Sequence, residues 1–380
     1  MAKPNPFLAL SSAAMALPAF AAPQPVETIV AIKATTYQEE DVPQRDVLAG
    51  SDERYKIDIG QFRLLTPVGE KWSLGVDVAY ETMSGASPWG TIMGADGEAS
   101  LIMSGATIRD KRTEVSLTAT HHGESRSISV GLTSSDEDDY EARAVAISGE
   151  WEMNNKLSTL SLGVSYSNDD IEPTDALSFG RVQREEKKSR SLSAGWAQVL
   201  NKNSVLHVGL DVTDHDGYLS DPYKLRDVRP DEKLEWALSL KYRRYFDNQN
   251  AALHLDYRYY DDDWGINSHT FHTGWHQNFG DNVRVVPNVR YYSQNEADFY
   301  RGTDDFGLAT SVNQSSDFRL SGYGAYTMGV KLIYSALQWD VSLSLDRYIS
   351  DKSYGHDASD QSHPALLSFN MTSVGLNFRF

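Results

Sequence analysis

Apolar and polar side chains alternate residue by residue along most of this chain, and no other feature restricts its possible folds as strongly. The alternation is clearest over residues 72–80, 160–166, 206–212, 253–260 and 339–346. Successive side chains of a β-strand point to opposite faces, whereas a helix would distribute such residues around its axis. Each run therefore predicts a strand with one apolar and one polar face.

The links between these runs alternate in length. Short links, most of them rich in Asn, Gly or Asp, are typical of hairpin turns. They are residues 67–70, 121–125, 154–156, 201–203, 247–250, 280–282 and 335–337. The longer links are residues 39–53, 82–108, 134–139, 168–187, 214–232, 261–266, 294–317 and 350–364. Together they delimit about 16 strands, from near Thr28 to Phe380.

A single transmembrane antiparallel β-barrel explains both patterns. Such a barrel has an even number of strands, short periplasmic turns, long extracellular loops, an apolar outer face and a polar interior. A soluble β-sandwich also alternates, but it does not sort its links by length, and its apolar faces meet a second sheet. A β-propeller would repeat every ~40 residues, and no such repeat occurs. The sequence therefore predicts an all-β membrane barrel.

Aromatic residues lie near the ends of the predicted strands, where the two interfacial girdles of a membrane barrel are expected. These residues are Trp72, Tyr80, Trp151, Tyr166, Trp236, Tyr257, Tyr259, Trp275, Tyr291, Tyr334 and Trp339.

The composition is consistent with a barrel although it resembles that of a soluble protein. The 380 residues include 35 Lys and Arg against 53 Asp and Glu, for a net charge of −18 and a mean hydropathy of −0.46. Strict alternation averages hydropathy away, because only every second residue faces lipid. The negative charge argues against nucleic acid as a partner. The absence of Cys excludes disulfides, thiolate zinc sites and iron–sulfur clusters.

The N-terminal segment has the pattern of a secretory signal. Lys3 precedes an apolar stretch from Phe7 to Phe20, and Ala19-Phe20-Ala21 provides an A-x-A cleavage site. A buried N-terminal helix is the alternative. We expect residues 1–21 to be a cleaved signal peptide and residues 22–380 to form the barrel, exported to the outer membrane of a Gram-negative bacterium. After this segment no uncharged run approaches the ~18 apolar residues of a spanning helix.

The C-terminal segment is an alternating strand that stops on Phe380. Leu376, Phe378 and Phe380 share one face, and they resemble the signal that outer-membrane assembly machinery reads. A strand that ends with the chain also fits a closed barrel, in which no strand edge is left unpaired.

Several short strings are similar to an uncharacterised bacterial outer-membrane group, the domain-of-unknown-function family 3570. They are residues 36–39 (TYQE), 84–88 (SGASP), 217–224 (GYLSDPYK), 257–260 (YRYY) with 263–265 (DWG), and 290–294 (RYYSQ) with 297–300 (ADFY). The resemblance implies an outer-membrane barrel encoded near exported redox or flavin-related proteins. It carries over no catalytic residue.

Over residues 234–292, the side chains on the polar face of each predicted strand should point into the lumen, and the charged ones among them are candidates for a charged lumen. They are Glu235, Lys241, Arg243, His254, Asp256, Arg258, Arg284 and Arg290. Charges of both signs across a channel create a field that orients polar solutes. The alternative is that these are ordinary polar residues of a water-filled barrel.

Four histidines of the same parity, His207, His254, His272 and His276, are candidate metal ligands. Residues four apart on one strand are roughly 13 Å apart, so a shared ion would need histidines from different strands. Acidic clusters at 136–139, 214–216, 261–263 and 304–305 favour a solvated outer surface.

No nucleophile elbow, phosphate loop, zinc-protease motif or Ser–His pattern appears in the sequence. We therefore predict no enzyme activity and no cofactor. The favoured function is a porin-like aqueous channel for the transport of small solutes, with the aromatic-bearing links 82–108 and 294–317 as candidate constrictions. One alternative is a barrel that sheaths an exported redox or flavin-related partner or a lipoprotein, and another is a surface-exposed binding barrel. The expected partners are outer-membrane lipid, lipopolysaccharide and the assembly machinery.

Overall fold

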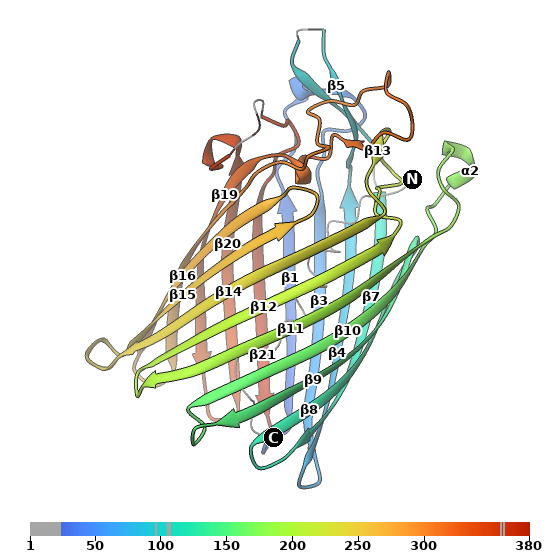
Figure 1. Ribbon diagram of the computed structural model, residues 1–380. Helices are drawn as coiled ribbons and strands as arrows, with labels where there is room; N and C mark the ends of the chain where they lie inside the picture. The colour runs from blue at the N-terminus through green and yellow to red at the C-terminus, as the bar shows by residue number, and fades with distance from the viewer. Residues whose placement is uncertain (1–23, 96, 105–107, 358, 360–361) are drawn as a thin grey trace.

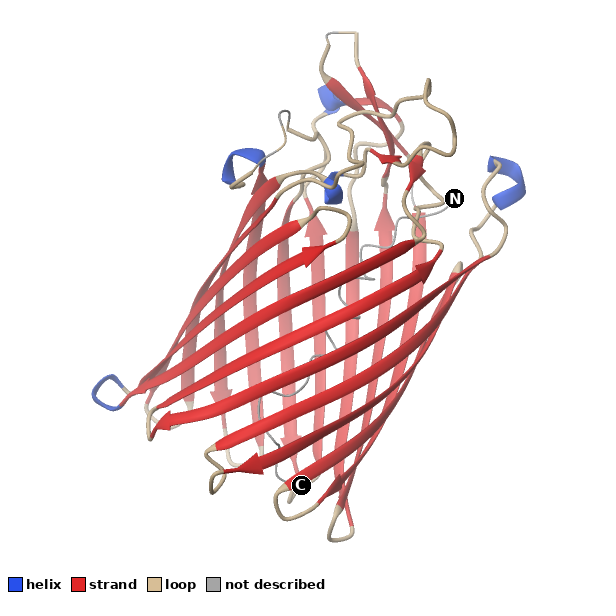
Figure 2. Cartoon of the chain, viewed as in Figure 1, coloured by secondary structure: helices blue, strands red, loops and turns tan. Residues whose placement is uncertain are grey.

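The computed structural model describes residues 24–95, 97–104, 108–357, 359 and 362–380, and in these residues sixteen strands form one closed antiparallel barrel (Figures 1 and 2). This confirms the predicted fold class. The strands of the barrel wall are β1 (Ile29–Glu39), β3 (Lys56–Val68), β4 (Trp72–Gly85), β7 (Ile108–His122), β8 (Arg126–Glu137), β9 (Tyr140–Met153), β10 (Ser158–Ile171), β11 (Glu185–Asn201), β12 (Ser204–Gly217), β14 (Glu232–Phe246), β15 (Ala251–Asp262), β16 (Asn267–Phe279), β17 (Val283–Gln294), β19 (Tyr323–Ser335), β20 (Trp339–Asp351) and β21 (Ser368–Arg379).

Shorter elements lie in the links. A three-stranded sheet contains β2 (Val47–Ala49), β5 (Pro88–Met93) and β6 (Ala99–Met103), and a two-stranded sheet contains β13 (Asp227–Val228) and β18 (Gln314–Ser315). The helices are η1 (Gln44–Asp46), α2 (Ala176–Phe179), η2 (Asp247–Gln249), η3 (Phe318–Leu320) and η4 (Lys352–Tyr354). Within the described residues, no helix combines the length and apolarity needed to cross a membrane. The predicted signal segment, residues 1–21, lies outside the described residues.

The first and last strands close the barrel. β1 pairs with β21 along its whole length, from Ile29 opposite Arg379 to Glu39 opposite Phe369. Two backbone bonds between Thr28 and Phe380, of 3.2 and 3.0 Å, complete this seam. The C-terminal strand therefore ends with the chain because its final residues complete the ladder.

The links sort by length onto the two ends of the barrel (Figure 1). All seven predicted short links lie at the end where the chain terminates, and the predicted long links lie at the opposite, loop end. At the β9–β10 turn, Asn154, Asn155 and Lys156 all adopt positive φ, a conformation that Asn tolerates better than most residues. The short-link prediction is confirmed.

Strands extend further into the long links than the hydrophobic pattern indicates. The predicted long link 134–139 is reduced to residues 138–139, because β8 continues to Glu137 and β9 begins at Tyr140. Backbone pairing continues there because the ladder needs only N–H and C=O groups, not an apolar face. Strands of 11 to 17 residues, such as β1 and β11, reach or exceed the ~9–11 residues that cross a bilayer.

The barrel exposes its apolar side chains outward. Leu132, Leu192, Met328 and Val330 are 55, 55, 57 and 42 % exposed, although each lies in the middle of a strand. Soluble monomers rarely leave such large continuous apolar surfaces uncovered. The buried apolar clusters, such as Trp264, Ile266, Ala297 and Leu320, lie at the loop end instead.

Candidate functional site in the barrel interior

The barrel encloses a cavity of about 1650 Å³. Its lining is dominated by inward side chains of the strands, and residues of the β12–β14 link line it from the loop end. The sides of the cavity differ in chemistry, because the inward residues of β8–β11 are small and those of β14–β19 are long and charged.

One side of the cavity is a small-residue wall. It consists of Ser129, Gly131, Thr133, Ala144, Ala146, Ser148, Gly163, Ser165, Ser167, Ser189, Ser191 and Ser193. Some of these hydroxyls bond across the ladder, as Ser191 Oγ and Thr213 Oγ1 do at 3.0 Å. Short side chains leave the space of the cavity unfilled, and their hydroxyl groups make this wall polar.

The charged side contains the residues predicted from parity. Glu235, Lys241, Arg258 and Arg290 line the cavity. The other four candidates share the inward parity of their strands, whose outward residues include Leu240, Leu255 and Val289. They are Arg243, His254, Asp256 and Arg284, and the cavity lining does not include them.

Hydrogen bonds connect several of these side chains. Arg243 donates to Asp256 at 2.5 Å, and His272 Nδ1 lies 3.4 Å from the other oxygen of the same carboxylate. Arg284 donates to Asn278 at 2.7 Å rather than to a carboxylate. A single register row crosses the wall from Lys241 through Asp256 to His272. Residues thirty positions apart in sequence are thus neighbours on one surface.

The candidate metal-ligand histidines come together only in part. His254 and His276 stack with their ring centroids 3.8 Å apart, and His272 bonds to Asp256. His207 is buried with its ring beside Gly195 of β11, and it lies opposite Lys241 in the register. Among the described residues no three histidines bring ligand atoms together, and the one group of three close ligand atoms is Asp110, Glu137 and Asp139.

Compact ion-paired groups lie nearer the loop end. Arg112 lies within 4 Å of carboxylates of Glu81, Glu114 and Glu137. Lys187 Nζ lies 3.0 Å from Asp169. In the third group, Lys233 Nζ lies 2.9 Å from Glu235 and 3.1 Å from Asp262. Most carboxylates in these three groups near the loop end therefore lie beside a cation.

Above these three groups, four segments interlock across the loop end. We call them the loop cap: residues 88–93, 218–231, 295–322 and 362–367. Leu225 N donates to Trp89 O at 2.6 Å, Asp304 N donates to Thr91 O at 2.7 Å, and β13 pairs with β18. The loop cap thus joins links that are far apart in the sequence.

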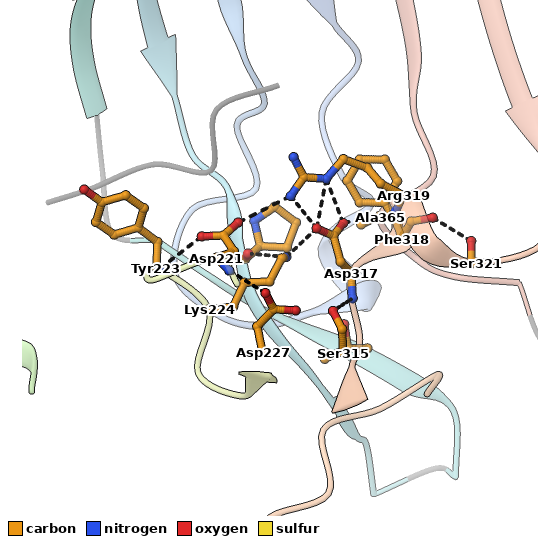
Figure 3. Close-up of polar contacts among 12 residues, drawn as sticks. Asp221, Tyr223, Lys224, Asp227, Ser315, Asp317, Phe318, Arg319, Ser321 and Ala365 are labelled. Atoms are coloured by element: carbon orange, nitrogen blue, oxygen red, sulfur yellow. Dashed lines mark hydrogen bonds and ion pairs between the residues drawn. The ribbon is translucent and has the colours of Figure 1, made fainter. Parts of the chain in front are cut away.

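Asp317 is the electrostatic centre of the loop cap (Figure 3). Its carboxylate is fully buried and accepts from Arg229 Nη2 at 2.9 Å and from Arg319 Nε at 2.9 Å. Lys224 Nζ lies 4.0 Å away, and Arg319 also reaches Asp221 at 3.3 Å. Burial opposes ionisation of Asp317, but these cations hold its pKa well below the usual value. The carboxylate is therefore charged at neutral pH.

Of the predicted constrictions, the described residues of 82–108 contribute only Met83 of β4 to the cavity lining, and those of 294–317 contribute none. From the loop cap, the segment Leu219–Tyr223 with Arg229 and Arg319 lines it. The four aromatic residues of the two longest links, Trp89, Phe299, Tyr300 and Phe306, do not belong to the lining. Phe299 of the loop cap packs edge-on against Trp264, and Phe306 is 61 % exposed to solvent. Neither side chain therefore narrows the cavity.

Sequence reasoning missed the charged residues outside 234–292 and the contacts that hold the loop cap together. The inward parity of Lys33 and Lys331 was readable from the alternation, because each lies between apolar residues of its strand. No local pattern identified Asp317 or Arg229, since only tertiary contacts bring them together.

The comparisons with solved structures agree with the barrel fold. A structure described as a bacterial polysaccharide outer membrane secretin has a TM-score of 0.53 and 10% identity, with 93% of this chain and 98% of that chain covered. The CymD monoaromatic hydrocarbon channel has a TM-score of 0.43 and 11% identity, with 93% of this chain and 88% of that chain covered. OccK1 of Pseudomonas aeruginosa has a TM-score of 0.42 and 11% identity, with 93% of this chain and 98% of that chain covered. At these identities the likeness concerns the fold alone.

A search of curated proteins found no match to this chain. A protein-family model described as "Protein of unknown function (DUF3570)" matches residues 7–371, which is nearly the whole sequence. The chain therefore belongs to the DUF3570 family, as the short sequence strings predicted.

Proposed function

We propose that this protein is an outer-membrane channel for small polar solutes and that the loop cap controls access to its lumen. The observation that carries the proposal is the polar cavity of about 1650 Å³ inside a closed barrel. A volume above the usual ~300–1,000 Å³ of a ligand pocket accommodates hydrated solutes.

The outward surface supports the membrane location. Apolar residues cover the middle of the strands, and aromatic residues such as Trp72 and Tyr80 occur towards opposite ends of β4. At ~3.3 Å per residue these two positions are roughly 26 Å apart along the strand. At the ~35–45° tilt of barrel strands this corresponds to roughly 18–21 Å along the bilayer normal, which falls within the ~25 Å apolar band of outer-membrane barrels.

The loop cap supports control of access at one end. Tyr223, Arg229 and Arg319 face the cavity from above, and Arg229 and Arg319 also bind the buried carboxylate of Asp317. Release of these bonds would let the segment 218–231 move away from the lumen. Loops with localised charge contacts can take part in such two-state changes.

Planar-bilayer recordings test this function. The purified protein should conduct, and the variant Arg229→Gln/Arg319→Gln should conduct more or stay open longer, because the cap contacts with Asp317 are lost. Arg190→Gln is the matched control, since Arg190 pairs with Asp214 through exposed side chains away from the cap. Absence of conductance in both the native protein and the double variant would contradict the channel. A stoichiometric partner recovered with a non-conducting barrel would favour the sheath alternative.

A further inference from the structure

Five cations line the cavity without a carboxylate partner. They are Lys33, Lys241, Arg258, Arg290 and Lys331. Among the described residues, none of the five has an Asp or Glu oxygen within 4 Å, and no contact stronger than a ring contact is found for the two arginines. Arg258 lies over the ring of Tyr260 and Arg290 over that of Tyr292, each 5.3 Å from the ring centroid.

These cations form one surface, which we call the basic wall. They project from β14, β15, β17, β19 and β1, which follow one another on the same side of the barrel with β16, β20 and β21 between them. Lys33 and Lys331 come from strands far apart in the sequence, and the register places Lys331 in the same row as Thr35, two residues from Lys33. Barrel closure therefore concentrates positive charge that the linear sequence distributes over 300 residues.

Other cations in the interior are neutralised. Arg63 lies 3.0 Å from Asp77, Arg243 pairs with Asp256, and Lys233 pairs with Glu235. Asp256, which lies opposite Lys241 in the register, already pairs with Arg243. Two further carboxylates face the basic wall at longer range: Asp211 lies near Lys241 and Arg258, and Asp346 lies near Lys33. Two carboxylates do not balance five cations, so an excess of positive charge remains.

We propose that the basic wall binds and selects small solutes that carry a carboxylate or phosphate group. This inference rests on the proposed channel function and names its solute class. Guanidinium groups bind such oxyanions through two parallel N–H donors, and ammonium groups add point charges. The small-residue wall on the other side of the cavity provides the room and hydroxyl groups for the rest of the solute.

The overall charge of −18 does not oppose this selectivity. Charges on exposed loops are screened by salt beyond a distance of ~8 Å. Charges inside a lumen with low-dielectric walls are screened less and attract ions of opposite sign. The charge that a solute meets within the barrel therefore decides its passage.

Reversal potentials across a KCl gradient provide the first test. The native protein should pass chloride in preference to potassium, and Lys241→Gln/Arg290→Gln should shift the reversal potential towards potassium. Lys202→Gln is a charge-matched control, because Lys202 lies in the short β11–β12 turn outside the cavity. A cation-selective native pore, or a double variant with unchanged selectivity, would overturn the inference.

A binding measurement separates this inference from the channel function. The measurement is isothermal titration calorimetry of the detergent-solubilised protein with inorganic phosphate and, separately, with acetate. The native protein and the Lys202→Gln control should show saturable binding, and the double variant Lys241→Gln/Arg290→Gln should show none. If the protein does not conduct but binds either oxyanion in this pattern, the channel fails and the basic wall stands. If the native protein conducts but binds neither and shows no anion preference, the channel stands and the basic wall fails. If the double variant binds phosphate and acetate as the native protein does, the assignment of oxyanion binding to the basic wall is also overturned.

Discussion

The guanidinium of Arg229 donates to the carboxylate of Asp317 across 2.9 Å, although 88 residues separate them in the chain. Asp317 has no exposed side-chain area, and Arg229 keeps only 13 % of its own. This bond joins the link after β12 to the link before β19, two strands that four others separate in the barrel wall. The loop cap is therefore held by a buried ion pair in addition to apolar packing, such as that of Ala297 and Leu320 against Trp264.

Neutralising Asp317 should loosen the loop cap. In Asp317→Asn, Arg229 keeps its charge in a largely buried position with Asp227, 2.8 Å away, as its remaining carboxylate. The loss should therefore be smaller than the about 3–5 kcal/mol of a buried pair that is broken completely. The segments 218–231 and 295–322 should become sensitive to limited proteolysis while the barrel strands remain protected. Arg190→Gln removes an exposed pair that contributes about 0–1 kcal/mol, and its loops should be cut no faster than those of the native protein. Equal protection of Asp317→Asn and the native protein would contradict this role.

Acid pH should also loosen the loop cap, through His363. Ala365 N donates to Nδ1 at 3.0 Å, so the proton lies on Nε2, 3.0 Å from Thr91 Oγ1. Burial lowers the pKa of His363 to about 3 from 6.5. Because the pKa is lower in the closed cap, its stabilisation is complete above pH 6.5 and declines as the pH falls towards 3. Proteolysis of the loops at stepped pH should show this decline, and His363→Gln should flatten it.

Asp304 should act in the opposite direction. Burial raises its pKa to about 6 from 3.8, so its contribution is complete below pH 3.8 and is lost as the pH rises through 6. Asp304→Asn should therefore make the loosening of the cap at acid pH steeper than in the native protein. The same proteolysis series measures this, and an unchanged slope in Asp304→Asn would exclude its contribution.

Neighbouring residues on β20 should respond differently to the same substitution. Leu345 is 48 % exposed on the outer surface, whereas Ser344 lies opposite the inward Lys331 in the register. Arginine on the lipid face of such a barrel costs about 2–4 kcal/mol near the bilayer midplane. Leu345→Arg should reduce the unfolding free energy in lipid vesicles by this amount, whereas Ser344→Arg should lose only the about 0.2–1 kcal/mol of a like charge opposite Lys331. Equal losses would argue against a lipid-facing outer surface.

Filling the small-residue wall should obstruct the cavity. Ala146 faces inward on β9, and the adjacent Ile147 is 50 % exposed on the outside. We expect Ala146→Trp to reduce single-channel conductance by occupying space that short side chains leave open. Ile147→Trp changes the same strand on its outer face and should conduct as the native protein does. A full conductance in Ala146→Trp would mean that solutes do not pass along this wall.

Much of the barrel follows from local pattern. The strand runs, the short turns and the final strand ending at Phe380 were all readable, because a period of two assigns each residue to one face. The inward parity of Lys241 and Arg290 follows from the same rule. Which of these charges are neutralised does not follow, since Arg243 pairs with Asp256 on the next strand, while Lys241 has no carboxylate within 4 Å in the part of the chain that the structure describes.

The sequence by itself determined the wall of this protein, because alternation is a local property that each strand satisfies independently. Only the tertiary structure decided how the lumen is charged and capped. Barrel closure brings Lys33 of β1 near Lys331 of β19, and loop packing buries Asp317 against Arg229. Such pairings depend on strand register, barrel closure and the paths of long polar links. None of these produces a periodic pattern in the sequence of the residues involved.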